Sequence, residues 1–239
     1  MTYYQVRELI LKYVKYSSNI LGVRVDEIKF SILTSGDVAN YINKDNKNII
    51  TISEYLIYML VDMLNNQDSM FEYYLEDDGY LLLLKIINHE LYHIYQYNII
   101  KNMTTVDDEN YVLYEEFVIL EELLEFYKDN HDNFRLEILA DIFAYEQSLE
   151  ILKSDFYEEY LKKESYIKKK IKELQNRLNS ISYIINLDNL FIKKALGDID
   201  VNDLSTNKQR RIIIKKLVAT NSNLLKVYPL LSKGIRDLE

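Results

Sequence analysis

The chain has 239 residues, a net charge of −9, no cysteine, no tryptophan and a single proline. This length is enough to bury a substantial core, so a metal ion is not needed merely to hold the fold together. The absence of cysteine excludes a disulfide framework and a thiolate zinc site, which leaves histidine and carboxylate as the ligands for any transition metal.

The N-terminal part of the chain predicts one helix followed by a small sheet. Residues 3–21 carry apolar side chains at the spacing of one helical face, and Gly22 is placed to end that helix. Three stretches with the composition of strands follow, at residues 28–32, 38–42 and 48–52. Because the turn-rich residues 43–47 join the last two, we expect a hairpin within a small antiparallel sheet.

The rest of the chain predicts helices. Ser53 is placed to cap a helix that extends to Asn65. The helix from Tyr80 to about Asn98 is apolar nearly all round in its first half, which is typical of a helix buried in a core. Further helices are expected at residues 111–128, 134–152, 156–178 and 181–196, and again before the C-terminus. The expected fold class is therefore α+β, mostly helical.

The two parts of the chain differ in charge. Residues 151–239 contain 18 Lys and Arg against 11 Asp and Glu, a balance of +7, which leaves −16 for residues 1–150. We expect a core domain at residues 1–155 and a basic, helical C-terminal region at residues 156–239. A solvated basic face is the favoured interpretation of this region, and nucleic-acid binding is the alternative that is not favoured.

The sequence gives no sign of a membrane partner. The amphipathic first helix carries Arg7, Glu8, Lys12 and Lys15, unlike the apolar stretch of a signal peptide. No run of 18 apolar residues occurs. We therefore expect a cytoplasmic protein, and its oligomeric state is left open.

The motif His89-Glu90-Leu91-Tyr92-His93 is the strongest signal in the sequence. On a helix, residues i and i+4 share a face, so the two histidines would present both imidazoles to one point with Glu90 beside them. Random placement of these residue types would give only about 0.003 such motifs in this chain. The motif therefore predicts a metal site with a general base, most simply a zinc site.

A catalytic zinc site needs a third protein ligand, and two candidates remain. Gln96 and Ile99 stand where metzincin peptidases carry a glycine and a third histidine, so that class is excluded. Glu137 is the preferred ligand, because Asp141 follows it by one helical turn and can accept the free N–H of a ligand histidine. His131, in a loop-like stretch, is the second candidate.

Together these residues resemble the gluzincin metallopeptidases, which combine H-E-x-x-H with E-x-x-x-D on the next active-site helix. The stretch Glu137 to Ala144, with Ala140, Asp141 and Phe143, is similar in wording to the ImmA/IrrE-like peptidases of phages and mobile elements, and to a second, usually membrane-anchored, gluzincin family. The resemblance covers roughly residues 28–152. It implies a zincin-like core with an active-site helix, in which His89, His93 and Glu137 bind zinc and Asp141 supports a ligand.

The resemblance also implies a reaction and a substrate. Glu90 would act as general base for a metal-activated water that hydrolyses a protein or peptide, and residues 48–52 would form the edge strand along which that substrate lies. Tyr92 departs from the family pattern, which usually has glycine there, and 43 residues separate His93 from Glu137, more than expected for ImmA-like proteins. Two alternatives stay open: a binding or regulatory protein with a DNA or repressor partner, and a structural protein whose motif is accidental.

Overall fold

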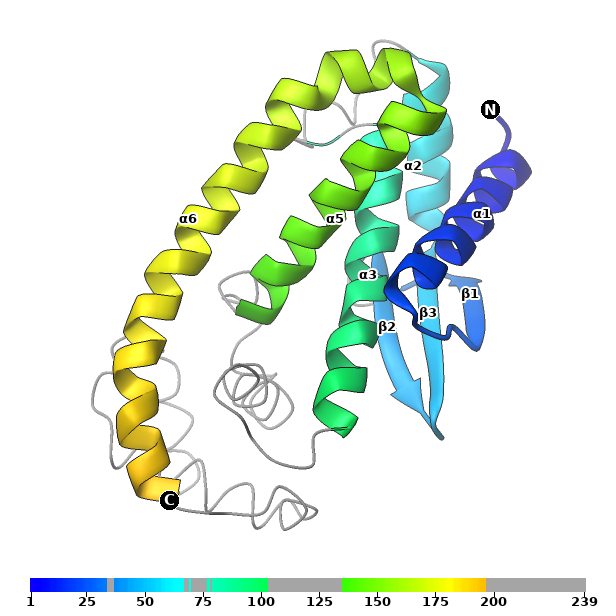
Figure 1. Ribbon diagram of the computed structural model, residues 1–239. Helices are drawn as coiled ribbons and strands as arrows, with labels where there is room; N and C mark the ends of the chain where they lie inside the picture. The colour runs from blue at the N-terminus through cyan, green and yellow to red at the C-terminus, as the bar shows by residue number, and fades with distance from the viewer. Residues whose placement is uncertain (34–36, 67–68, 70–76, 78, 103–134, 197–239) are drawn as a thin grey trace. The chain divides into compact units, whose positions relative to one another are not determined.

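The protein is mostly helical with one small sheet, as the sequence predicts. The computed structural model describes residues 1–33, 37–66, 69, 77, 79–102 and 135–196 (Figure 1). Its elements are α1 (Tyr3–Leu21), β1 (Glu27–Ser31), β2 (Ala39–Lys44), β3 (Lys47–Ser53), α2 (Glu54–Asn65), α3 (Gly79–Asn102), α5 (Arg135–Asp155) and α6 (Tyr157–Leu196). The helices predicted at residues 111–128 and after residue 200 lie outside the described residues.

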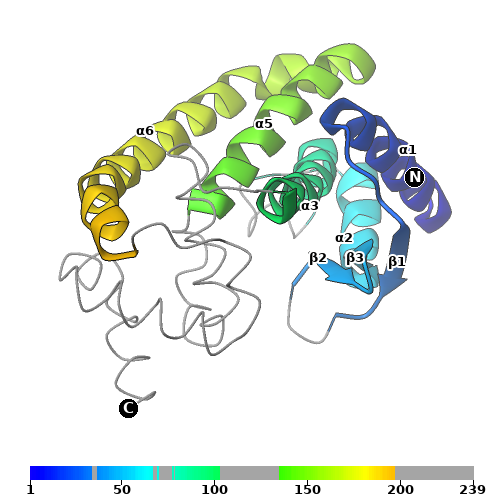
Figure 2. The ribbon, with the colours of Figure 1, turned by 60° about the horizontal axis from the view of Figure 1, so that its bottom comes forward.

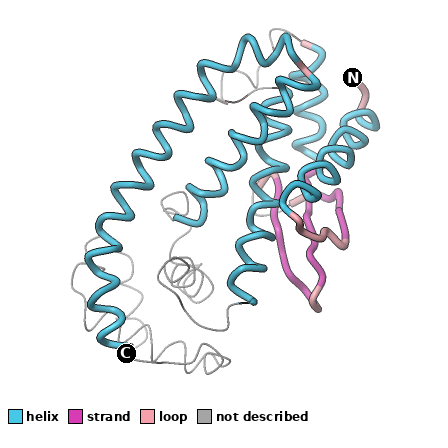
Figure 3. Tube along the Cα trace, viewed as in Figure 1, coloured by secondary structure: helices cyan, strands magenta, loops and turns pink. Residues whose placement is uncertain are grey.

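The chain divides into two compact units. The first contains residues 1–97 and 140–174, and the second contains residues 98–139 and 175–239. Every described strand and helix contributes to the first unit, where the strands form one small region among helices (Figure 3). The predicted boundary at residue 155 coincides with the break between α5 and α6, and its meaning as a domain boundary stays a prediction.

The sheet is mixed rather than antiparallel, with the strand order β1-β3-β2. β2 pairs antiparallel with β3 through the predicted hairpin, but β1 runs parallel to β3, so the expectation of an antiparallel sheet is wrong for that pair. The strand predicted at residues 48–52 is also not an edge strand, because β3 pairs on both sides. Its residues are buried from Asn48 to Ser53, as expected for a central strand.

Local signals explain where two elements turn. Thr2 caps α1 through a capping box with Gln5, and Gly22 ends the helix in the left-handed conformation with φ 64°. The hairpin turns at Asp45 and Asn46, with φ values of 54° and 60°. Two consecutive positive φ values are those of a type I′ turn, which asparagine and aspartate tolerate better than most residues.

The core of the first unit holds α3 in place. Helices α1, α2 and α3 lie on the same side of the sheet (Figure 2). Ile50 and Ile52 of β3 belong to one buried cluster with residues of these helices, among them Ile10, Leu60 and Leu84. α3 is buried on nearly every side from Leu81 to Ile87. This close packing holds the backbone of the helix in place, and with it the side chains of the motif that follows.

The last helix packs on this core through both aliphatic and aromatic residues. α6 runs without a break from Tyr157 to Leu196, whereas two helices were predicted there. Ile167 is fully buried, whereas Leu161, six residues earlier, is 59% exposed. Phe156, Tyr160 and Tyr166 pack against the core, so aromatic residues form much of the contact.

Candidate metal centre

The two histidines of the motif face each other across one turn of α3. His89 and His93 are half-buried, and their Nε2 atoms lie 3.0 Å apart. Leu91 and Ile94, on other sides of the helix, are fully buried in the core. The helical spacing thus places both imidazoles at one point, with their orientation supported by a rigid helix.

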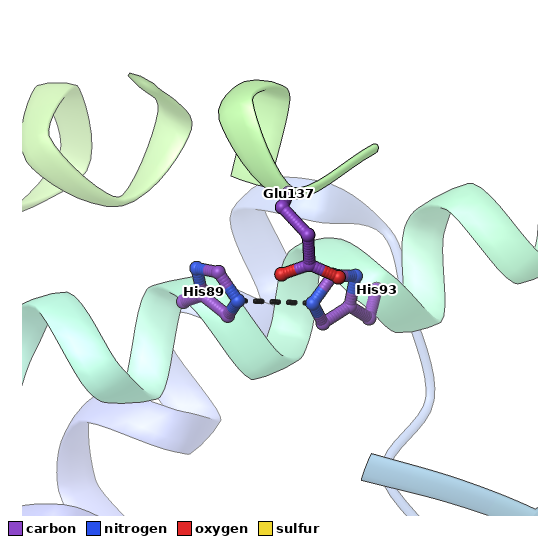
Figure 4. Close-up of side chains that lie close together, drawn as sticks. All are labelled: His89, His93 and Glu137. Carbon is purple, nitrogen blue, oxygen red and sulfur yellow. Dashed lines mark hydrogen bonds between the residues drawn. The ribbon is translucent and has the colours of Figure 1, made fainter. Parts of the chain in front are cut away.

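Glu137 joins the two histidines. It lies in the first turn of α5 and is 6% exposed. One ligand atom each from His89, His93 and Glu137 lie within 4.8 Å of one another, and Figure 4 shows the carboxylate placed over both rings. Two donors that bind one zinc ion tetrahedrally lie about 3.3 Å apart, so this group is compact enough to hold a single metal ion.

Asp141 makes the hydrogen bond that the sequence predicts for it. Its Oδ1 lies 3.0 Å from Nδ1 of His89. A carboxylate accepts hydrogen bonds, so Nδ1 of His89 carries the proton and Nε2, which faces Nε2 of His93 at 3.0 Å, is the nitrogen with the lone pair. That lone pair is directed at the gathered ligand atoms, which is the arrangement that metal-binding histidines usually have.

His93 has its own hydrogen-bond partner, which the sequence reasoning missed. Oε1 of Gln96 lies 2.8 Å from Nδ1 of His93, and Gln96 is 3% exposed. Gln96 was noted only as a departure from the metzincin pattern. Its position three residues after His93 on a helix was the available signal, because side chains at i and i+3 are neighbours.

The donor set fits a metal ion. Both Nδ1 atoms are held by acceptors, so two imidazole nitrogens and one carboxylate offer lone pairs at one point. Such a set suits zinc and other divalent transition metals. These residues therefore form a group that could hold a metal ion.

Two other candidate residues stand apart from this group. Glu90 is 9% exposed beside His89, but it is not one of the three side chains that gather in the described part of the chain. His131, the second candidate for the third ligand, lies outside the described residues. The roles predicted for the site residues stay predictions.

Tyr92, which stands where the family pattern usually has glycine, packs between α3 and α5. Its ring stacks on Phe143 of α5, with centroids 4.8 Å apart and an interplanar angle of 24°. Burial raises the pKa of its hydroxyl. The Tyr92 ring therefore connects α3 to α5 at Phe143, two residues after Asp141. A glycine at position 92 could not make this contact.

β2 is the strand that contacts the far part of α3. The rings of Tyr41 on β2 and Tyr97 on α3 pack edge to face with centroids 6.2 Å apart, and the Tyr97 hydroxyl donates to Oδ1 of Asn43 at 3.4 Å. The Tyr41 hydroxyl donates to Oδ1 of Asn48. Through these side chains β2, an edge strand of the sheet, contacts the part of α3 that follows the motif.

One buried side chain next to the motif has no assigned partner. Asn88 is fully buried, and neither its Oδ1 nor its Nδ2 has a hydrogen-bond partner among the described residues. Nothing in the described structure explains this arrangement.

Comparisons with family models, with curated proteins and with solved structures found no match. Among the described helices, none is long and apolar enough to cross a membrane.

Proposed function

We propose that the protein is a zinc-dependent peptidase of the gluzincin type. The observation that carries the proposal is the convergence of His89, His93 and Glu137, with Asp141 behind His89. Three protein ligands that leave a further coordination position open are typical of catalytic rather than structural zinc sites. An enzyme is therefore favoured over a purely structural role.

The chain's own residues supply the rest of the chemistry. A bound zinc ion supplies Lewis acidity, which lowers the pKa of water toward ~7 and polarises a carbonyl. Glu90 accepts the proton of the attacking water and returns it to the leaving amine. Asp141 keeps the Nε2 lone pair of His89 directed at the site, because it holds the proton on Nδ1.

The substrate is proposed to be a protein or peptide that binds as an extended strand. An extended peptide adds to a sheet at an edge, through main-chain hydrogen bonds. Residues 48–52 cannot bind the substrate in this way, because they lie in the central strand β3. We therefore propose that the substrate binds along β2, the edge strand that contacts α3.

Metal analysis of the purified protein tests the proposal. We expect about one zinc per chain in the wild type and in Glu90→Gln, and none in His93→Ala or Glu137→Ala. Glu146→Ala, also on α5 but outside the group of ligands, is the matched control and should keep its zinc. Absence of any bound metal from wild-type protein would refute the proposal.

Hydrolysis of an unstructured protein substrate then tests the enzyme. Glu90→Gln should keep zinc and lose activity by about 10²-fold or more, because general base catalysis contributes that much. A strong chelator should abolish wild-type activity, and added zinc should restore it. If chelation changes neither activity nor stability, the motif is accidental, as the structural alternative predicts.

The binding-protein alternative gains no support from the described part of α6. Three of its lysines pair with glutamates of the same helix at i,i+3 and i,i+4 spacing, in Lys162–Glu159, Lys168–Glu164 and Lys169–Glu173. Paired charges of this kind are typical of a solvated helix face. Deleting residues 156–239 would remove every contact that α6 makes with the core, so charge reversal of Lys168 and Lys169 is the better test of DNA retention.

A further inference from the structure

The two histidines of the candidate centre are held by different chemistry. Nδ1 of His89 bonds to a carboxylate whose side chain is 31% exposed, whereas Nδ1 of His93 bonds to the neutral amide of Gln96, which is 3% exposed. Both distances, 3.0 and 2.8 Å, are those of well-formed hydrogen bonds. The second partner is therefore the more deeply buried one.

An amide can select either tautomer of the ring that it contacts. With Oε1 toward the ring, Gln96 accepts the Nδ1–H of His93 and leaves Nε2 with a lone pair. With the amide turned over, its NH₂ group would donate to Nδ1, and the proton of His93 would lie on Nε2. The Nε2 atoms of the two rings are 3.0 Å apart, so that proton would be donated to Nε2 of His89, and the hydrogen bond between the rings would close the shared site.

We propose that Gln96 is a positioning residue that holds His93 in the Nδ1–H tautomer, so that both histidine Nε2 lone pairs are directed at the same point. The effect on metal affinity rests on the proposed function, but the tautomer itself does not. Gln96 thereby does for His93 what Asp141 does for His89.

A neutral partner suits this second position. The site already contains the carboxylates of Glu137 and Asp141, with Glu90 beside His89. A carboxylate in place of Gln96 would be the fourth at the site, so it would add negative charge near the metal and reduce its ability to polarise a substrate. The amide sets the tautomer of His93 without that charge, and burial protects its hydrogen bond from competition with water.

The first test reads the tautomer directly in metal-free protein. Nitrogen NMR of the histidine rings should give a protonated Nδ1 and an unprotonated Nε2 for His93 in the wild type. Gln96→Met removes the acceptor but keeps the length of the side chain, and it should give mixed tautomers or a protonated Nε2. Gln96→Glu restores an acceptor and should restore the wild-type pattern.

The second test measures zinc affinity by competition with a chelator. Gln96→Met should weaken zinc binding by about 10- to 100-fold, the usual effect of losing a residue that supports a ligand. Gln96→Glu should stay within a few-fold of wild type, and Gln147→Met on α5 is the matched control for the same change at another glutamine. Thermal unfolding of each variant separates a folding defect from a local effect.

The outcomes separate the two proposals. If the wild type binds no zinc, the proposed function fails, and the tautomer of His93 still decides the role of Gln96. A wild-type protein in which His93 carries its proton on Nε2 would overturn the inference, even if Gln96→Met does not fold. Unchanged tautomer and affinity in a folded Gln96→Met variant would overturn it as well.

Discussion

Asp141 acts on His89 through a hydrogen bond, which makes its contribution measurable. The carboxylate oxygen accepts from Nδ1 at 3.0 Å, and it also raises the basicity of the ring. We expect Asp141→Ala to weaken zinc binding by about 10- to 100-fold. Asp141→Asn should lose less, because an amide oxygen can still accept the Nδ1–H.

Competition with a chelator at fixed pH measures both Asp141 variants. Glu146→Ala, on the same helix and exposed, is the control and should leave the affinity unchanged. An Asp141→Ala variant with wild-type affinity would show that the carboxylate does not support the ligand. Neither substitution needs to disturb the core, since Asp141 is only half-buried.

Much of the site could be predicted at the residue level because helical spacing is local information. His89 with His93, and Glu137 with Asp141, are i,i+4 pairs, and the structure brings the members of the two pairs together. The role of Gln96 could not be predicted in the same way, since an amide three residues from a histidine is common. Its burial and its hydrogen bond to His93 are visible only in the structure. The position of the Glu90 carboxylate relative to the ligands depends on how other elements pack around it, which helical periodicity does not specify.

At the level of elements, α1 is fastened to the end of α5 by three polar side chains. Asp155 accepts hydrogen bonds from Lys12 at 2.7 Å and from the Tyr13 hydroxyl at 2.8 Å. The bond from Lys12 is the main cause that lowers the pKa of Asp155 from 3.8 to about 2. Burial, with the bond to Asp155, raises the pKa of Tyr13 to about 12.

The Asp155 contacts predict a pH-dependent stability. The folded state holds the charged carboxylate more strongly than the unfolded state does, so the stabilisation is present above pH 3.8 and is lost as the pH falls through about 2. Because the Asp155 side chain is one-third exposed, we expect about 1 kcal/mol after solvent screening. Urea unfolding of the wild type and Asp155→Asn should differ by that amount at pH 6 and converge near pH 2.

A surface pair provides the comparison for Asp155. Glu159 and Lys162 form an i,i+3 pair within α6, and Glu159→Gln should change stability by less than about 0.5 kcal/mol. If the difference between wild type and Asp155→Asn persists undiminished at pH 2, the charged carboxylate is not its source.

Predictions for elements succeeded where the signal is short-range. The bounds of α1 and the hairpin follow from capping residues and turn residues close to them in sequence. Helix α2 begins directly after Ser53, as predicted, but the Ser53 side chain makes no capping hydrogen bond. The parallel pairing of β1 with β3 joins residues more than 20 positions apart, and nothing in the composition of either strand specifies it. The error about the edge strand has the same cause, because strand order is a property of the assembled sheet.

At the scale of the first compact unit, one buried carboxylate joins three helices. Asp77 is 5% exposed and accepts hydrogen bonds from Tyr145 of α5 and Tyr166 of α6, and it forms an ion pair with Lys85 of α3 at 2.9 Å. Burial, followed by the charge of Asp77, raises the pKa of Tyr145 well above its ordinary range. These contacts hold α3 against the elements that pack on it.

Removal of this carboxylate should destabilise the whole unit. We expect Asp77→Ala to lower the free energy of unfolding by about 3 kcal/mol, because three donors lose their partner in a buried place. A double-mutant cycle with Tyr145→Phe should give a coupling of about 1–2 kcal/mol. Urea unfolding measures all four proteins, and additive effects would mean that the hydrogen bond of 2.8 Å between Tyr145 and Asp77 does not contribute to stability.

The fold class was predictable from the whole sequence, whereas this network was not. A chain with one proline, five glycines and long periodic stretches gives a mostly helical protein on composition and periodicity alone. Asp77 lies between the helices predicted up to Asn65 and from Tyr80, where no element was predicted, and its two tyrosine partners are 68 and 89 residues away. Contacts of such range depend on how helices pack, which the local pattern leaves open.

The centre draws its ligands from one turn of α3 and one turn of α5, with the same four-residue step in each. The three candidate ligands are His89, His93 and Glu137. Asp141 on α5 hydrogen-bonds to His89, and Gln96 on α3 hydrogen-bonds to His93. Such a compact unit is portable. We expect that these five residues, placed at the same spacing on two facing helices of a designed bundle, would form the same candidate metal site in an unrelated protein.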